Sequence, residues 1–275
     1  MNRILMQLLK CPICGMGMAV TEDERVCKCL GPKTHCYDFA RSGHLHLGGP
    51  HAGEGDSKEA VQARRAFLDA GYYQPLSDRI CEILNTVPSA TVLDAGCGEG
   101  YYTNRMASES RAVLGVDLSR AGVESAAKRA KQQGKNAAFT VASIFSLPVQ
   151  SLALDAVVNI FAPCAENEFL RVLKPGGHLL VVGAGERHLM GLKSAIYDNP
   201  YENQARADLP IHMELISRQR LQTEITVVGQ ENIRALFSMT PYYWRTSKHD
   251  FEKLNHLEKL TTEVDFDIFF FKKKI

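Results

Sequence analysis

The fold is decided by residues 90–107, which read ATVLDAGCGEGYYTNRMA. A β-rich run ends in Asp94, and a helical pattern begins a few residues later. The loop between them contains three glycines, Gly96, Gly98 and Gly100. Glycines permit a tight turn and let a ligand lie against bare backbone, with the N-terminus of the following helix nearby. The stretch therefore predicts a strand, a ligand-binding loop and a helix in succession.

The residues after this loop repeat the alternation of strand and helix. A second β-rich run, AVLGVDLS at 112–119, contains Asp117 about twenty residues beyond the glycines, where an acidic side chain can accept hydrogen bonds from ribose hydroxyls. Further strands are expected within residues 137–143, 154–163 and 170–183, and the final FFFKKKI is expected to be a last strand with a basic tail. Strands that alternate with helices at this spacing predict a mostly parallel, doubly wound α/β sheet.

The form of the glycine loop distinguishes between cofactors. A dinucleotide site typically has G-x-G-x-x-G, whereas this loop reads GCGEGYY. The motif LDAGCGEG, with the later LPV, LDAVV and RVLKPGG, resembles class I S-adenosylmethionine-dependent methyltransferases, which have a Rossmann-like fold. The resemblance implies that Asp94 and Glu99 lie near the methionine end of the cofactor. It also implies that Asp117 holds the ribose and that Ser143 and Ile144 flank the adenine. The alternative to a methyltransferase is an NAD-dependent enzyme.

A cluster of cysteines near the N-terminus predicts a metal site. Cys11 and Cys14 are separated by two residues and followed by a glycine, and five residues separate Cys29 from His35. A tetrahedral zinc site takes four Cys or His ligands from two such knuckles, carried by a small hairpin. We therefore predict a zinc site formed by Cys11, Cys14, Cys29 and His35. The alternative ligands in the second knuckle are Cys27 and Cys36.

Composition narrows the class of protein. The chain has 275 residues, 45% of them apolar, and no run approaches the ~18 to 20 apolar residues of a membrane helix. The N-terminus has no secretory signal pattern, so a cytoplasmic protein that does not enter a membrane is expected. A reducing compartment keeps the eight cysteines as thiols, which favours metal ligation over disulfides. Gly- and polar-rich residues 46–59 suggest a linker.

Several longer blocks point to a narrower family. A short Cys/His module followed by GDSKEAVQARRAFLDAGYYQPL, VLDAGCGEGYYT, APC, ERHLMGLKSAIY and LFSMTPYYWR is similar to the bacterial 23S rRNA (guanine-N1)-methyltransferases of the RlmA type. The resemblance implies that a guanine in a hairpin loop of 23S rRNA is methylated at N1. It also implies that Tyr73, Gly98, Glu99 and His188 touch the cofactor. The chain departs from the family in a longer second knuckle, CKCLGPKTHC, and in the histidines of HLH at 44–46.

This resemblance and the linker composition suggest three regions. They are a zinc-binding, rRNA-recognising module (1–47), a linker and helix (48–75) and a methyltransferase domain (76–275). We accordingly expect a fragment that begins near Ser57 to bind the cofactor and to lose rRNA methylation. A homodimer is also compatible with the sequence.

The chemistry of the implied substrate calls for residues that stack the base and for a general base. N1 lies in the pairing edge of guanine, so the base must come from a loop or be extruded and stacked on aromatic side chains. Tyr242, Tyr243 and Trp244 are candidates for this stacking, with packing at the edge of the core as the alternative. No general base can be assigned; Cys164 and Glu166 follow the strand where related enzymes position the base.

The net charge is compatible with local RNA binding and with two alternative functions. A charge of only +1 argues against a uniformly basic nucleic-acid binder, although a local basic track is compatible with it. The cations considered for this track, each with a solvated side chain as the alternative, are Lys33, Arg41, Arg64, Arg65, Arg187, Arg245 and Lys248. The alternatives are a methyltransferase for a small molecule, whose zinc module serves stability or dimerisation, and an RNA-binding protein without catalysis.

Overall fold

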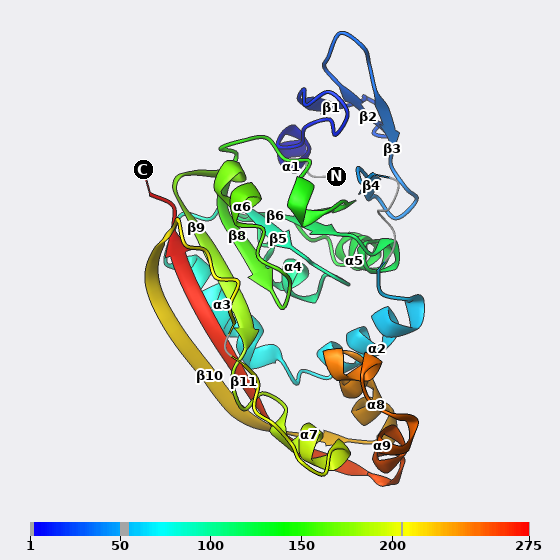
Figure 1. Ribbon diagram of the computed structural model, residues 1–275. Coiled ribbons are helices and arrows are strands. Elements are labelled where there is room, and N and C mark those ends of the chain that lie inside the picture. Colours follow the sequence, from blue (N-terminus) through cyan, green and yellow to red (C-terminus); the bar gives the residue numbers. More distant parts are fainter. Residues whose placement is uncertain (1–2, 50–54, 205, 275) are drawn as a thin grey trace.

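The computed structural model describes residues 3–49, 55–204 and 206–274, and its centre is a sheet of eight strands (Figure 1). The order of the strands across the sheet is β10-β11-β9-β8-β5-β6-β7-β4. The strands are β4 (Leu45–His46), β5 (Thr91–Ala95), β6 (Ala112–Asp117), β7 (Ala137–Val141), β8 (Leu154–Ile160), β9 (Leu173–Ala184), β10 (Glu214–Val228) and β11 (Lys259–Lys272). Strands β4 to β9 of this sheet pair in parallel, while β10 and β11 are antiparallel. The expected doubly wound α/β fold is confirmed.

Helices cover both faces of this sheet. The longer ones are α2 (Lys58–Asp69), α3 (Gln74–Asn85), α4 (Tyr101–Met106), α5 (Arg120–Gln132), α6 (Glu166–Val172), α7 (Met190–Ile196), α8 (Gln230–Ser238) and α9 (Lys248–Lys253). Short 3-10 turns are η1 (Ile144–Ser146), η2 (Pro241–Trp244) and η3 (Leu254–His256). Side chains alternate across a strand, so Val92 packs in one apolar cluster with α3 and α8. Its neighbour Leu93 packs in the other, with α6.

The N-terminal module is joined to this sheet. It consists of α1 (Arg3–Gln7) and an antiparallel sheet of β1 (Met18–Val20), β2 (Val26–Cys29) and β3 (Cys36–Asp38). Leu5 and Leu9 are fully buried in the same cluster as Leu114 of β6. The chain then adds β4 to the edge of the main sheet, beside β7. Residues on both sides of the expected boundary at residue 47 therefore share one hydrophobic core.

Two further observations concern expectations from composition. Residues 50–54 of the glycine-rich stretch expected to be a linker lie outside the described residues. Within the described ranges, none of the helices has the length and apolar character needed to cross a membrane.

Candidate functional site: a cofactor cavity and a Cys/His cluster

The glycine loop lies between the end of β5 and the start of α4. Gly96 has φ +88°, and a Cβ there would lie 2.6 Å from the Cβ of Ala162. Gly100 has φ +79°, and a Cβ there would lie 2.5 Å from the Cβ of Ala126 in α5. Side chains at either position would collide with neighbouring segments, so both positions require glycine. The loop is thus packed against Ala162, just after β8, and against α5.

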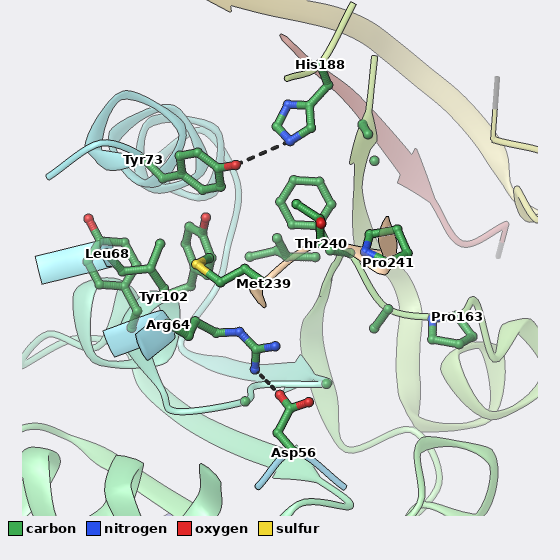
Figure 2. Close-up of a pocket in the computed structure, with 18 of the residues that line it drawn as sticks. Asp56, Arg64, Leu68, Tyr73, Tyr102, Pro163, His188, Met239, Thr240 and Pro241 are labelled. Carbon is green, nitrogen blue, oxygen red and sulfur yellow. Dashed lines mark hydrogen bonds and ion pairs between the residues drawn. The ribbon is translucent and has the colours of Figure 1, made fainter. Parts of the chain in front are cut away.

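A cavity of about 820 Å³ opens at this loop (Figure 2). This volume falls in the range of about 300–1,000 Å³ typical of ligand pockets. Seven of the nine residues expected to bind the cofactor line it: Tyr73, Asp94, Gly96, Gly98, Glu99, Asp117 and His188. The structure therefore brings together residues that lie more than 100 positions apart in the sequence.

Asp117 is held in place by backbone donors. The N–H of Gly98 donates to its Oδ2 over 2.8 Å, and the N–H of Ser119 donates to its Oδ1 over 2.7 Å. Burial raises the pKa of this carboxyl group. Each carboxylate oxygen can accept one more hydrogen bond. The side chain is thus fixed, and it can still accept hydrogen bonds from hydroxyl groups in the cavity.

Two other acids in the cavity are deeply buried. Burial raises the pKa of Asp94 to about 7, although Thr103 Oγ1 donates a hydrogen bond of 2.5 Å to it. Glu99 is 1% exposed, and neither of its oxygens has a hydrogen-bond partner among the described residues. Arg129 Nη1 lies 3.4 Å from Glu99 Oε2. A buried carboxylate without hydrogen bonds is costly, so Glu99 fits a ligand that brings donors, such as the ammonium group of S-adenosylmethionine.

Tyr73 and His188 meet on another wall of the cavity (Figure 2). Tyr73 Oη lies 3.3 Å from His188 Nε2, and the backbone N–H of Asp265 donates to His188 Nδ1 over 3.2 Å. Burial lowers the pKa of His188 to about 4, so the ring is neutral near pH 7. Because Nδ1 accepts, Nε2 carries the proton and donates it to Tyr73 Oη. The hydroxyl hydrogen of Tyr73 can then point to a ligand.

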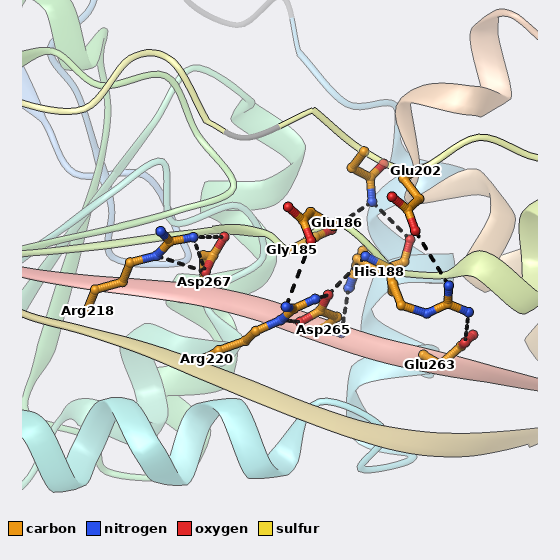
Figure 3. A network of polar contacts seen from close by, with 11 residues as sticks. Gly185, Glu186, His188, Glu202, Arg218, Arg220, Glu263, Asp265 and Asp267 are labelled. Atoms are coloured by element: carbon orange, nitrogen blue, oxygen red, sulfur yellow. Dashed lines mark hydrogen bonds and ion pairs between the residues drawn. The ribbon is translucent and has the colours of Figure 1, made fainter.

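Asp265 belongs to a network behind His188 (Figure 3). Its carboxylate accepts two hydrogen bonds of 2.7 Å from the guanidinium of Arg220 and one of 2.9 Å from the N–H of Arg187. Burial alone would raise the pKa of Asp265, but these donors lower it. Arg218 and Asp267 form an equivalent ion pair on the same two strands, β10 and β11, two residues further along each strand. The network fixes the turn that carries His188.

The two residues expected beside the adenine are not among those that line this cavity. Ser143 follows β7 and caps η1, Ile144 is buried, and neither lines the cavity. An ion pair between Asp56 and Arg64 lines it instead, next to Gly98 (Figure 2). The sequence suggested that Arg64 is either a solvated side chain or a contact to phosphate. Its acidic partner just before α2 gave no recognisable signal.

The Cys/His cluster lies in the N-terminal module. The ligand atoms of Cys11, Cys14, Cys29 and His35 all lie within 4.8 Å of one another. Cys14 Sγ is 3.8 Å from Cys29 Sγ, and His35 Nδ1 is 3.6 Å from Cys11 Sγ and 3.4 Å from Cys29 Sγ. Tetrahedral bonds of ~2.3 Å to sulfur and ~2.0–2.1 Å to nitrogen give edges of about 3.8 and 3.6 Å. The arrangement therefore fits a zinc ion.

The surroundings of the cluster favour this ligand set. The backbone N–H of His35 lies 3.1 Å from Cys29 Sγ and contributes most to a pKa of Cys29 lowered to about 6. A thiolate is the form that binds metals. Of the two alternative ligands, Cys27 is fully buried, with a pKa raised by burial to about 11, and Cys36 is exposed. Neither belongs to the group of converging ligand atoms.

The residues considered for stacking and for the general base lie in different places. Tyr242 lines the cavity, but it is buried, and its hydroxyl donates to Asn203 Oδ1 over 3.1 Å. Tyr243 is exposed and packs on Phe237 of α8, and the side chain of Trp244 lies outside the described part. Two further candidates, Cys164 and Glu166, do not line the cavity.

Comparisons with known proteins find similarity over nearly the whole chain. A family model described as a methyltransferase domain matches residues 87–238. The 23S rRNA (guanine(748)-N(1))-methyltransferase of Streptomyces fradiae is 28% identical over 98% of each chain. The protein YxjB of Bacillus subtilis, with the provisional name 23S rRNA (guanine-N(1)-)-methyltransferase, is 28% identical over 95% of each chain. These relatives confirm the resemblance found in the sequence.

A solved structure supports the fold alone. The crystal structure of the 4+2 cyclase SpnF matches with a TM-score of 0.50 and 20% identity, and the match covers 73% of this chain and 80% of that chain. A shared fold of this kind does not determine the reaction.

Proposed function

The chain belongs to the family of proteins with this methyltransferase domain, and from that premise we propose that it methylates N1 of a guanine in a hairpin loop of 23S rRNA. The methyl donor is S-adenosylmethionine. The observation that carries the proposal is the extent of the likeness: the two relatives align over 98% and 95% of this chain. The likeness therefore includes the Cys/His module and the C-terminal strands as well as the methyltransferase domain.

The cavity offers groups that complement the ribose and the methionine end of S-adenosylmethionine. In this proposal the glycine loop lies against the cofactor, and Asp117 accepts hydrogen bonds from the ribose hydroxyls. Glu99 and Asp94 face the methionine end, where the buried carboxylate of Glu99 meets the ammonium group. Tyr73 donates its free hydroxyl hydrogen. When bound, the cofactor supplies an electrophilic methyl group.

The reaction requires an exposed pairing edge and the loss of a proton. N1 of guanine is protonated near neutral pH and is hidden in a base pair, so the target must be unpaired or extruded. Positioning the base in line with the methyl group is then the main contribution of the protein. His188 does not accept the N1 proton, because Nδ1 is occupied by Asp265 N–H and Nε2 already carries a proton.

A methyltransferase for a small molecule is the second candidate. The observation that favours it is the apolar lining of the cavity by Leu236 and Met239, because such a lining also suits a small apolar substrate. In that case the N-terminal module only stabilises the chain or a dimer.

Transfer of a labelled methyl group separates the two candidates. Purified protein is incubated with S-adenosylmethionine labelled on the methyl group and with 23S rRNA from a strain that lacks the protein. The proposal predicts label in the RNA, and digestion followed by mass spectrometry should find 1-methylguanosine at one loop position. A matched RNA with that loop closed into a duplex should accept much less label. Absence of label from all rRNA would contradict the proposal and leave the small-molecule reaction.

A further inference from the structure

Phe161 has a backbone conformation that is unusual for its residue type. It directly follows β8 and has φ +52°, in the left-handed region that bulky side chains rarely adopt. Its side chain is 45% exposed and lines the cofactor cavity. A large apolar residue that is both strained and exposed is unfavourable on two counts. Such residues accumulate at functional sites, where the surrounding structure enforces the conformation.

The neighbouring chain enforces this conformation. The N–H of Phe161 donates to the carbonyl of Val182 in β9 over 3.1 Å. Arg206 donates to the carbonyl of the next residue, Ala162, over 2.6 Å, and to the same Val182 carbonyl over 3.0 Å. Asp208 in turn holds the guanidinium of Arg206, with a contact of 2.6 Å. Phe161 itself and the residue that follows it are thus tied to the sheet.

The ring of Phe161 has one covered side and one open side. Its centroid lies 5.8 Å from that of His188 and 5.9 Å from that of Phe266. Those two rings are only 5.0 Å from each other, so both lie on the same side of Phe161. Because Phe161 is 45% exposed and lines the cavity, the part of the ring that faces away from these two neighbours is accessible.

Other aromatic residues of the cavity are less accessible. Tyr73, Tyr101 and Tyr242 are each less than 10% exposed, and Tyr102 is partly buried. Among the aromatic side chains that line the cavity in the described ranges, Phe161 is therefore the exposed one. An extruded base needs an aromatic or apolar face to replace the stacking it loses in the RNA.

We propose that the open face of Phe161 is the platform on which the target guanine stacks. The inference rests on the proposed function and adds a residue that recognises the base. The left-handed backbone lets the ring stand against His188 and Phe266 at the edge of the cavity. Arg206 and Asp208 act as positioning residues, because they hold the carbonyl that follows Phe161 and do not themselves form the stacking face.

Three variants test the role of the ring. Phe161→Leu keeps an apolar side chain and removes the aromatic face, and Phe161→Tyr restores that face. Leu152→Asn is the matched control, because Leu152 also has a positive φ, +55°, is exposed and lies outside the cavity lining. For each, kcat/KM is measured with 23S rRNA, and the affinity for S-adenosylmethionine is measured by calorimetry.

The expected pattern separates stacking from folding. Stacking of one base on an aromatic side chain corresponds to a change of about 5- to 150-fold, so Phe161→Leu should lower kcat/KM for RNA within that range. Phe161→Tyr should recover most of the loss, and the control should resemble the wild-type chain. Cofactor affinity within about twofold of wild type in Phe161→Leu would show that the cavity is intact.

A spectroscopic measurement tests the contact without turnover. An RNA hairpin carries 2-aminopurine in place of the methylated guanine, and its fluorescence is followed as the wild-type protein or Phe161→Leu is added. Stacking predicts stronger quenching with the wild type than with the variant. Equal quenching and equal kcat/KM would overturn the role of Phe161 while the proposed function stands. Failure of the wild-type chain to methylate rRNA would overturn both.

Discussion

The backbone N–H of Asp265 lies 3.2 Å from His188 Nδ1 and fixes the imidazole proton on Nε2 (Figure 3). The carboxylate of the same Asp265 is held by Arg220 from the neighbouring strand β10. One residue of β11 thus sets both the position and the tautomer of a histidine in the cofactor cavity. A neutral imidazole in this state acts as a hydrogen-bond donor to Tyr73.

His188 should remain neutral far below the usual range for histidine. Its pKa is lowered to about 4 by burial, against ~6.5 in the unfolded chain. The contribution to stability is therefore full above about pH 6.5 and is lost as the pH falls towards 4. Between pH 7 and pH 5 the loss at this residue is about 2 kcal/mol. Histidine NMR titration, with His188→Gln for assignment, checks the pKa; a value near 6.5 would contradict the burial argument.

Zinc content should depend on the four converging ligands. We expect about one zinc ion per purified chain, and Cys14→Ser or Cys29→Ser should lose most of it, because three ligands do not complete the tetrahedral site. Cys36→Ser is the matched control, because this exposed thiol lies in the same hairpin and outside the cluster. Elemental analysis measures the ratio. Full zinc in Cys29→Ser would require a different ligand set.

Removal of the Asp117 carboxylate should weaken cofactor binding. Asp117→Ala leaves the ribose hydroxyls unpaired and frees the N–H of Gly98, so a loss of about 1–3 kcal/mol in binding free energy is expected. Glu124→Ala removes an acid that pairs with Lys128 on α5 and does not line the cavity. Calorimetry with S-adenosylmethionine compares the two variants. Wild-type affinity in Asp117→Ala would place the ribose elsewhere.

Deletion of the N-terminal module should reduce the stability of the remaining chain. A fragment beginning at Ser57 lacks the fully buried Leu5 and Leu9 and also strand β4, so it exposes part of the core of the sheet. Each such leucine contributes about 2–5 kcal/mol. This packing argues against the separable fragment expected from composition. Thermal unfolding of the fragment and of full-length Cys11→Ser distinguishes loss of packing from loss of metal. Equal melting temperatures for the fragment and the full chain would contradict the predicted loss of stability.

The cations of the module should leave a salt signature if they contact RNA phosphates. Lys33 and Arg41 are both exposed. Each phosphate contact adds roughly 0.7–0.9 to the slope of log affinity against log salt, so the double change to alanine should flatten the slope by about one to two units. Arg79→Ala, which breaks a pair with Glu82 on α3, serves as a control. An unchanged slope in the double variant would mean that these cations face solvent.

Local signals explain which parts of the fold could be predicted. The strand, glycine loop and helix at residues 91–106 are contiguous, and their pattern is complete within one short window. Strand β10 lacks such a signal, because most of its residues are exposed and its sequence ELISRQRLQTEITVV is largely polar. The two-residue strand β4 is too short for any periodicity, and only its pairing with β7 defines it.

The same distinction applies to the site. The two zinc knuckles, and the glycine loop with Asp117 about twenty residues further on, each lie within a short stretch, so their spacing predicts the two sites while leaving Cys27 and Cys36 as alternative ligands. The roles of Asp265 and Phe161 depend on contacts between distant segments. A positive φ at phenylalanine leaves no trace in the sequence. The ion pair of Asp56 and Arg64 in the cavity lining likewise joins two segments through a contact that no local pattern announces.

The pairing of β4 with β7 has a consequence for how an RNA would be measured. Leu45 lies opposite Thr140 and His46 opposite Val141, so the Cys/His hairpin is attached through the register of the sheet that also carries the cavity. An RNA that binds at both places therefore spans a fixed distance on the protein. The nucleotide presented to the cavity is then selected by its distance along the hairpin from the gripped phosphates, and one added base pair in the stem should shift methylation to a neighbouring position or abolish it.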